Sequence, residues 1–217
     1  MRRVAIYDLD KTLTRKATFT PFLVFTARRV APWRLALLPV WVGAMAGYKA
    51  KLYSRTALKT FGLKIMVGRI SRQHLAEIGA SFAQHQLADS GTMPATARLL
   101  EEDRQAGADL AIATAAFRFY AEHFAAHLGI RHVIATEWDG RAIPHGNCYG
   151  EEKYRRVMAW LARDIGARET FRLRFVSDSF ADAPLLDEAD DAILISPDAS
   201  KRRKAERRGW QAMSGLL

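Results

Sequence analysis

The most informative stretch of this 217-residue chain is Val4-Ala5-Ile6-Tyr7-Asp8-Leu9-Asp10-Lys11-Thr12. The apolar run over residues 4–6 is typical of a strand that is buried on both faces. Two carboxylates, Asp8 and Asp10, follow this strand only two residues apart. Ionised carboxylates at that spacing repel each other and are costly to bury unless a cation or hydrogen-bond donors compensate for them. The stretch therefore predicts either a site that uses a cation or an Asp-rich turn that caps the next element.

One arrangement would give both carboxylates a chemical role. Asp8 and the backbone carbonyl of Asp10 would bind a hard cation, Asp8 would attack an electrophile, and Asp10 would act as acid and base. Thr12 would hold a phosphoryl oxygen at the turn of the loop. In the alternative, Asp10 or Thr12 only caps the element that follows. A D-x-D-x-T match is weak by itself, so the rest of the chain has to decide.

Length and composition restrict the class of protein. The chain is long enough for one substantial core, or for a core with a smaller appendage. Its apolar content of 49% excludes a disordered chain. The single cysteine, Cys148, allows no internal disulfide, which fits a reducing compartment. No cleavable signal peptide is visible before the first strand, so we expect a cytoplasmic protein.

The net charge of +10 is concentrated in one segment. Residues 11–76 contain 13 Lys or Arg and no Asp or Glu, whereas the remainder contains 20 basic and 23 acidic residues. A local excess of this kind indicates that the segment has an anionic partner. Further Lys and Arg residues cluster over 201–208, where they either contact anions or form the solvated face of a helix.

Aromatic and basic residues alternate after residue 14, and three prolines divide the segment into short helices. Residues 35–48 carry no charge, but this run of 14 residues is shorter than the roughly 20 that a membrane-spanning helix needs. The run therefore predicts either a buried helix or an interfacial one, with Arg34 and Lys49 as headgroup anchors. Both interpretations remain open at this point.

From about residue 90 the pattern alternates between strands and helices. Strands are expected at 110–113, 130–135, 171–177 and 192–196, and helices at 96–106, 117–128 and 151–164. This alternation predicts an α/β fold with a doubly wound parallel sheet. Ligands of such sheets bind outside the carboxyl ends of the strands.

Polar side chains stand at those strand ends. Thr114 ends the second strand, Asp178 ends the fourth, and Asp182 lies one turn further on. Lys153 lies in the first turn of a helix. Together with Asp8 and Asp10, these residues predict a carboxylate site for a hard cation, two groups that bind phosphate oxygens, and a nucleophile.

These motifs resemble those of the haloacid dehalogenase superfamily of phosphotransferases. Tyr7–Thr12 matches the first motif, Thr114 the second, Lys153 the third and Ser177–Asp182 the fourth. About 100 residues separate the first two motifs, which is similar to the phosphoserine-phosphatase-like branch with a helical cap. The resemblance implies a Rossmann-like catalytic core of residues 1–14 plus 90–217, with an all-helical cap of residues 15–89 inserted into it.

The resemblance also implies a role for each site residue. Asp8 would form an aspartyl-phosphate, and Asp10 would protonate the leaving oxygen and then activate water. Asp8, the Asp10 carbonyl and Asp178 would hold Mg²⁺. Binding of the phosphoryl group would fall to Thr12, Thr114 and Lys153. Asp182 would orient Lys153 or a metal-bound water from behind.

Some positions depart from the family pattern. Lys11 stands where glycine is common, and Ala115-Ala116 follow Thr114 without a small polar residue. The phosphate then has one side-chain donor fewer. Residues 10–14 also fit the D-K-T-x-T of ion-pumping ATPases, but that alignment misplaces the partner from the fourth motif. Dehalogenases of the family lack the second aspartate, so Asp10 favours phosphate chemistry.

The character of the inserted segment suggests a substrate. It has no acid before Glu77, so it offers nothing to the ammonium group of a substrate such as phosphoserine. It resembles the cap of C-type phosphatidylglycerophosphate phosphatases, which implies a membrane lipid phosphate as substrate and a location on the inner face of the membrane. The residues expected to face the membrane or the substrate are Arg28, Arg29, Trp33, Arg34 and Trp41.

Two alternatives remain open. One is a soluble phosphatase for small metabolites such as phosphoserine. The other is a non-catalytic protein that has an inactive phosphatase-like core and binds anionic membranes or nucleic acid. Nucleic acid is the less favoured partner. A phosphorylated substrate is expected for the lipid phosphatase and for the soluble phosphatase, but not for the non-catalytic protein.

Overall fold

The computed structural model describes residues 1–215, and its centre is a six-stranded, wholly parallel sheet. The strand order is β3-β2-β1-β4-β5-β6, so β1 lies inside the sheet between β2 and β4. The strands are β1 (Arg2–Tyr7), β2 (Asp109–Phe117), β3 (His132–Thr136), β4 (Phe171–Ser177), β5 (Asp191–Ile195) and β6 (Gln211–Met213). The predicted doubly wound parallel sheet is confirmed.

Side chains of the strands alternate between two hydrophobic layers. In β1, Ala5 and Tyr7 face one layer, while Val4 and Ile6 face the other. The first layer packs against α5 (Pro94–Gln105) and α6 (Arg118–His127), and the second against α7 (Glu151–Trp160), α8 (Ala183–Glu188) and α9 (Ala199–Glu206). The near-continuous apolar sequence of β1 follows from this burial on both faces.

Two features of the sheet differ from the sequence prediction. Strand β2 continues to Phe117, past Thr114, because its pairing with β3 shifts register between Ala113 and Phe117. Within this irregular stretch the Thr114 Oγ1 accepts a hydrogen bond from the Ala116 N–H at 3.0 Å. The sixth strand, β6, was not predicted, since it is only three residues long and follows the basic helix α9.

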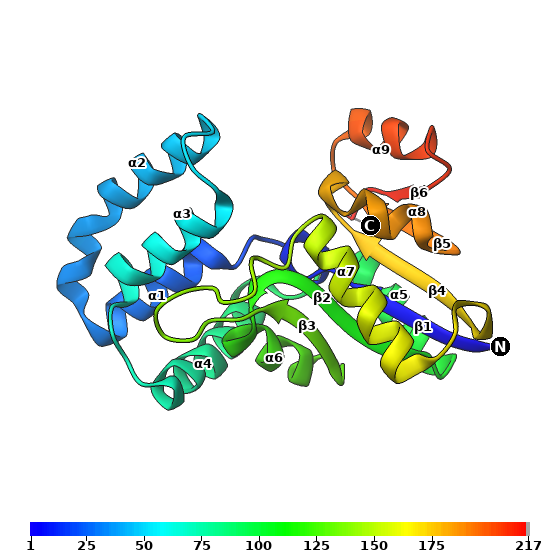
Figure 1. The fold of residues 1–217 in the computed structure, drawn as a ribbon, viewed down its shortest axis with the longest axis horizontal. Coiled ribbons are helices and arrows are strands. Elements are labelled where there is room, and N and C mark those ends of the chain that lie inside the picture. Colours follow the sequence, from blue (N-terminus) through cyan, green and yellow to red (C-terminus); the bar gives the residue numbers. More distant parts are fainter. Residues whose placement is uncertain (216–217) are drawn as a thin grey trace.

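A helical insertion, which we define as residues 15–89, separates β1 from α5. It contains α1 (Phe19–Val30), α2 (Leu38–Lys49), α3 (Arg55–Gly62) and α4 (Arg72–Ser90), with shorter turns at Pro32–Leu37 (η2) and Leu63–Val67 (η3). Ser54 and Ser71 cap α3 and α4, where their side chains accept hydrogen bonds from Ala57 and His74. Helices α1, α2 and α3 lie at one end of the molecule, and α4 runs back beside α6 (Figure 1).

The insertion and the sheet share one hydrophobic cluster. Phe22 of α1 contacts Phe82 of α4 and Tyr120 of α6, with ring centroids 5.4 and 5.0 Å apart. Gly79 lets α4 approach α6 closely, because a Cβ there would lie 2.0 Å from the Phe119 carbonyl oxygen. This packing anchors the α4 end of the insertion to the sheet.

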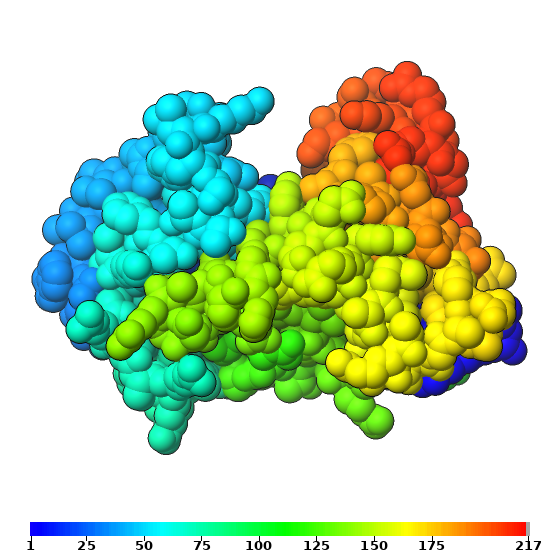
Figure 2. All heavy atoms as spheres, viewed as in Figure 1, coloured from blue at the N-terminus to red at the C-terminus, as the bar shows by residue number. Residues whose placement is uncertain are grey.

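Helix α2 is apolar on every side, yet Trp41 is its only buried residue. None of the helices in residues 1–215 combines the length and apolarity that crossing a membrane requires. The space-filling view shows a notch between the tip of the α2–α3 pair, in cyan, and the C-terminal part, in orange and red (Figure 2). Residues near 150, in yellow-green, lie at its floor.

Candidate active site

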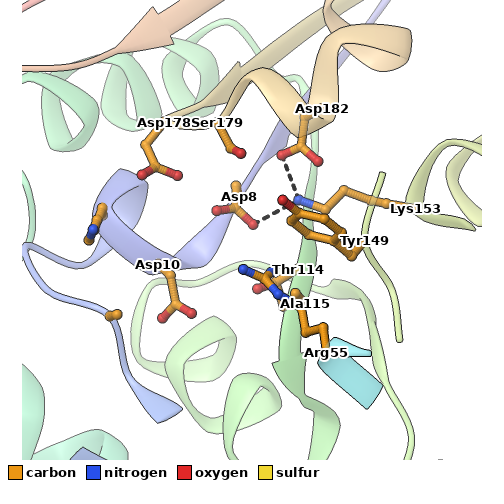
Figure 3. A pocket seen from close by; sticks show the side chains of 12 residues that line it. Asp8, Asp10, Arg55, Thr114, Ala115, Tyr149, Lys153, Asp178, Ser179 and Asp182 are labelled. Atoms are coloured by element: carbon orange, nitrogen blue, oxygen red, sulfur yellow. Dashed lines mark hydrogen bonds and ion pairs between the residues drawn. The ribbon is translucent and has the colours of Figure 1, made fainter. Parts of the chain in front are cut away.

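A pocket of about 180 Å³ lies at the carboxyl edge of the sheet. In Figure 3 the carboxyl groups of Asp8, Asp10 and Asp178 surround one space, and Lys153 reaches in from α7. The remaining lining residues are Lys11, Ala17, Arg55, Thr114, Ala115, Tyr149, Ser179 and Asp182. The strand ends of β1, β2 and β4 and the first turn of α7 therefore meet here, as the parallel topology requires.

Lys153 is the centre of a buried charge cluster. Its Nζ donates to Asp8 Oδ1 at 2.9 Å and to Asp182 Oδ2 at 2.7 Å. Ser177 donates to the same Asp182 oxygen at 2.7 Å. Asp8 Oδ2, by contrast, accepts no hydrogen bond from the residues that the structure describes, and it belongs to a side chain that lines the pocket. One oxygen of Asp8 is thus fixed while the other is left open.

Asp10 is held apart from this cluster. The backbone N–H and the hydroxyl of Thr18 both donate to Asp10 Oδ1, at 2.8 and 2.7 Å. The Tyr120 hydroxyl lies 3.3 Å from the Thr18 oxygen. The loop around Asp10 is irregular: Asp10 has φ of −68° and ψ of 122°, and Lys11 after it has φ of 59°.

Negative charge exceeds positive charge in the pocket. Burial is the main cause that raises the pKa of Asp8 to about 7, and the neighbouring carboxylates raise it further against the attraction of Lys153. Burial likewise raises the pKa of Asp178 to about 6. Burial opposes the charge of Lys153, but Asp8 and Asp182 outweigh it and raise the lysine pKa. The lysine stays charged, and the carboxylates remain short of positive charge.

These residues fit a hard divalent cation. In residues 1–215 no three His, Cys, Asp or Glu side chains form a ready metal-ligand group. The donor set would consist of two carboxylates, from Asp8 and Asp178, the backbone carbonyl of Asp10, and water. Oxygen donors of this kind suit Mg²⁺, which keeps several waters when it binds to proteins. The cation would also compensate for the burial and the carboxylate repulsion that raise the pKa values of Asp8 and Asp178.

The sequence-predicted residues do not all reach the pocket. Asp8, Asp10, Thr114, Lys153, Asp178 and Asp182 line it. Thr12 does not, because its side chain is fully buried beneath the loop and its hydroxyl has no hydrogen-bond partner. The Thr12 side chain thus lies outside the pocket in which we expected it to meet a phosphoryl oxygen.

Sequence reasoning missed three residues of the site. Thr18 holds Asp10, and Arg55 lies over the Tyr149 ring at 3.9 Å with both residues at the pocket. Thr18 and Arg55 belong to the insertion, whose docking on the core has no sequence motif. Only their positions in the sequence could have indicated a role at the site, since Thr18 shortly follows the Asp10 turn and Arg55 begins a helix.

A second pocket of about 260 Å³ adjoins the first. The two pockets share Asp10, Ala17, Arg55 and Ala115. The second one has an aromatic wall from the insertion and from α6, with basic residues among the rings. Its other lining residues are Phe19, Thr20, Trp41, Met45, Tyr48, Lys49, Leu58, Lys59, Ala116 and Tyr120.

The residues expected to face a membrane or the substrate fall into different places. Trp33 is 65% exposed, and Arg28 and Arg29 are exposed as well. Trp41 is 1% exposed and lines the second pocket, so it is not available to a membrane. Arg34 donates to the Ile65 carbonyl at 2.6 Å and thereby ties η2 to η3.

Relatives of the chain include proteins named as phosphatases. A probable phosphatase of Mycobacterium tuberculosis is 26% identical over 98% of this chain and 75% of the relative. A phosphoserine phosphatase of the same organism is 27% identical over 95% of this chain and 69% of the relative.

A solved structure covers the whole fold. A protein with unknown function from Bordetella pertussis superposes with a TM-score of 0.85 at 27% identity, over 100% of both chains. The family model described as haloacid dehalogenase-like hydrolase matches residues 5–187, which include Asp8, Thr114, Lys153 and Asp182. The chain belongs to the haloacid dehalogenase-like hydrolase family.

Proposed function

We propose that this protein is a Mg²⁺-dependent phosphoric monoester hydrolase that works through an aspartyl-phosphate on Asp8. The observation that carries the proposal is the buried Asp8–Lys153–Asp182 cluster, which leaves one oxygen of Asp8 open to the pocket. The family match and the relatives named as phosphatases support hydrolysis of phosphate monoesters.

The first chemical step is attack by Asp8. Lys153 fixes Asp8 Oδ1, so Oδ2 is the oxygen presented to a phosphorus atom in the pocket. The ammonium group and the Thr114 hydroxyl lie where they can meet the charge on the transferred phosphoryl oxygens. Asp182 and Ser177 hold Lys153 from behind, which keeps it charged and oriented.

Asp10 is suited to move the proton. Its carboxyl lines the pocket but is directed away from Asp8 by the two hydrogen bonds from Thr18. From there it gives a proton to the leaving alcohol oxygen and, in the second step, takes one from the water that hydrolyses the aspartyl-phosphate.

Asp8, Asp178 and the backbone carbonyl of Asp10 would hold Mg²⁺. When bound, the cation supplies positive charge that offsets the phosphate and the carboxylates. The other side chains at the pocket have separate roles: Lys153 and Thr114 bind the phosphoryl group, and Asp10 transfers the proton.

The test is phosphate release from a panel of monoesters, with Mg²⁺ or with EDTA. The panel contains 4-nitrophenyl phosphate, phosphoserine and phosphatidylglycerophosphate. We expect release that needs Mg²⁺, together with a phosphoryl adduct on Asp8 detectable by intact mass after acid quenching. No release from any ester, with vesicle binding intact, would favour the non-catalytic alternative.

We further propose that residues 15–89 form the cap and that the substrate is a lipid phosphate at an anionic membrane surface. Helix α2 supports this, because one side of it packs against the hydrophobic cluster, through Trp41 and partly buried residues such as Met45, while apolar residues on its other side are exposed. Its neighbourhood exposes further apolar side chains, namely Trp33, Val40, Val42, Leu52, Tyr53 and Phe61. Basic residues surround them, and no acid occurs in residues 11–76 to oppose an anionic surface.

The basic helix α9 lies across the notch from α2 and α3 (Figure 1). It carries Lys201, Arg202, Arg203 and Lys204. Exposed basic residues therefore occur on both sides of the notch, on α9 and at Lys49 of α2, which would let an anionic surface face the notch.

A soluble metabolite such as phosphoserine is the rival substrate, supported by the name of one relative. In the substrate panel, faster turnover of phosphoserine than of phosphatidylglycerophosphate in anionic vesicles would favour the rival. Protein that stays in the supernatant with such vesicles at low salt would remove the membrane proposal and leave the phosphatase proposal standing.

A further inference from the structure

Lys59 is a buried cation in the insertion. It lies on α3 with 6% of its surface exposed, and its Nζ stands 4.6 Å above the centre of the Phe117 ring. The Nζ donates to Asn147 Oδ1 at 2.8 Å and to the Ala115 carbonyl oxygen. Two of its three N–H groups are thereby used, and the side chain lines the second pocket.

Lys59 has no carboxylate partner. It takes part in none of the ion pairs within residues 1–215, and Asp10 is the one acid among the described residues that line its pocket. The Asp10 oxygen Oδ1 is already occupied by Thr18. Burial lowers the pKa of Lys59 to about 7, although the charge of Asp10 opposes this shift. A buried cation without a counter-charge is costly unless an anion joins it.

Donors also outnumber acceptors around Lys59. Asn147 accepts from Lys59 through Oδ1, but its Nδ2 is buried without a hydrogen-bond partner. The Thr136 hydroxyl donates to the same Ala115 carbonyl oxygen at 2.8 Å. The position where the insertion meets the core is therefore short of acceptor atoms and of negative charge.

We propose that Lys59 is a specificity-determining residue that binds a second anionic group, carried by the alcohol part of the substrate. This inference rests on the proposed phosphatase function and narrows its substrate class. The phosphoryl group would occupy the first pocket, and the alcohol would pass Asp10 into the second, which shares residues with the first. There the remaining N–H of Lys59 would meet a carboxylate or a phosphodiester.

The aromatic wall defines the rest of this substrate. Phe19, Trp41 and Tyr48 line the pocket around Lys59 and offer an apolar surface beside the cation. The ligand is thus a phosphomonoester whose alcohol combines an anionic group with apolar atoms. A lipid headgroup and a small organic acid share this chemistry, so the test uses one probe of each kind.

The test compares substrates that differ in the second charge. One pair is 3-phosphoglycerate and glycerol 3-phosphate, and the other is dihexanoyl phosphatidylglycerophosphate and hexyl phosphate. In the wild type we expect kcat/KM to be at least about 10-fold higher for the anionic member of one pair. The pair that shows the preference tells whether the carboxylate or the phosphodiester is the source.

Lys59→Met should abolish that preference by raising KM for the anionic substrate. Lys59→Gln keeps a donor for the Ala115 carbonyl and serves as a second variant in case Lys59→Met does not fold. Lys64→Met is the matched control, because Lys64 is an exposed lysine of the same insertion. Equal losses on both members of a pair would mean that Lys59 only fastens the insertion to the core, and the proposal would be overturned. A wild type without any preference would overturn it as well.

The failure of the phosphatase proposal is distinguishable from these outcomes. If the wild type releases no phosphate even from 4-nitrophenyl phosphate, the proposed function fails. The same pairs are then compared by calorimetric binding to the wild type and to Lys59→Met. A preference for the anionic probe that disappears in the variant still supports the role of Lys59, and unchanged affinities overturn it.

Discussion

The strand-end pocket and the helical insertion differ in the sign of their excess charge. In the pocket, Lys153 is buried between two carboxylates at hydrogen-bond distance. In the insertion, Arg28 and Arg29 lie exposed, and Lys59 is buried without an ion-pair partner among the described residues. The pocket keeps an excess of carboxylates that a cation would neutralise, whereas the insertion has an excess of positive charge that an anion would neutralise. The difference is consistent with the proposal that the strand ends carry the chemistry and the insertion binds the rest of the substrate.

Asp8→Asn is the largest expected perturbation of the pocket side. The amide is a poor nucleophile, so we expect kcat to fall at least about 10³-fold, equivalent to about 4 kcal/mol in the barrier. Phosphate release from 4-nitrophenyl phosphate measures it, with Asp89→Asn, an exposed residue of α4, as control. Near-wild-type turnover in a variant shown by mass to be free of deamidation would assign the nucleophile elsewhere.

Asp10→Asn should separate the two kinds of leaving group. An aryl phosphate departs with little protonation, so we expect a loss of about 10²-fold or more for alkyl phosphates and a smaller one for aryl phosphates. Rapid-quench measurement of the first turnover isolates the cleavage step from hydrolysis of the intermediate. Equal losses on both substrate types would contradict a proton-donating role.

The dependence of stability on pH tests the excess negative charge in the pocket. The pKa values of Asp8 and Asp178 are raised to about 7 and about 6, so the fold favours their protonated forms. Their stabilising contribution is complete below about pH 4 and is lost as the pH rises towards 7.

Without metal, the contribution of these two groups to the free energy of unfolding should therefore fall over this range, by an amount on the order of a few kcal/mol. The midpoint temperature of unfolding should fall with it. Mg²⁺ binds the ionised carboxylates, so its stabilising effect should be larger at pH 8 than at pH 5. Scanning fluorimetry of the wild type and of Asp8→Asn measures both effects. A Mg²⁺ effect that is equal at the two pH values would argue against these ligands.

Thr18→Val tests the one contact by which the insertion controls the acid. The variant keeps the backbone N–H bond to Asp10 and loses the hydroxyl bond of 2.7 Å. One such bond to a charged group is worth about 1.5 kcal/mol, so we expect roughly a 10-fold lower kcat/KM on alkyl phosphates. Thr26→Val is the matched control, since the Thr26 hydroxyl is buried and has no hydrogen-bond partner among residues 1–215, and its loss should leave activity unchanged.

The smallest expected effect concerns the exposed charges of the insertion. Replacing Arg28 and Arg29 with Gln should weaken binding to anionic vesicles by about 1 kcal/mol for each charge that reaches the surface. Co-sedimentation over a range of salt measures it, with Arg163→Gln, an exposed residue of the core, as control. Arg34 is left out because it supports the backbone of η3. Vesicle binding that stays equal in the variant and the wild type would contradict attachment through this face.

Residues at strand ends could be predicted because strand topology places them. Once the sheet is parallel, Asp8, Thr114 and Asp178 must share one edge, and their local sequence identifies each strand. Thr18 and Lys59 could not be predicted, because their positions depend on how α1 and α3 pack against the core. That packing is produced by dispersed contacts such as Phe22 on Tyr120, which leave no periodic signal. The exposure of α2 was undecided for the same reason.

The position of β1 inside the sheet has a consequence for how the protein folds during its synthesis. β1 leaves the ribosome first, but its partners begin at Asp109 and Phe171. At ordinary rates of synthesis, about 10–30 s pass before β4 emerges. During that time the helices of the insertion can form from local contacts, while the strand that carries Asp8 has no complete sheet to join. Asp8, the proposed nucleophile, can therefore take its place beside β4 only after most of the chain has been made, so we expect chains that end before β4 to lack phosphatase activity.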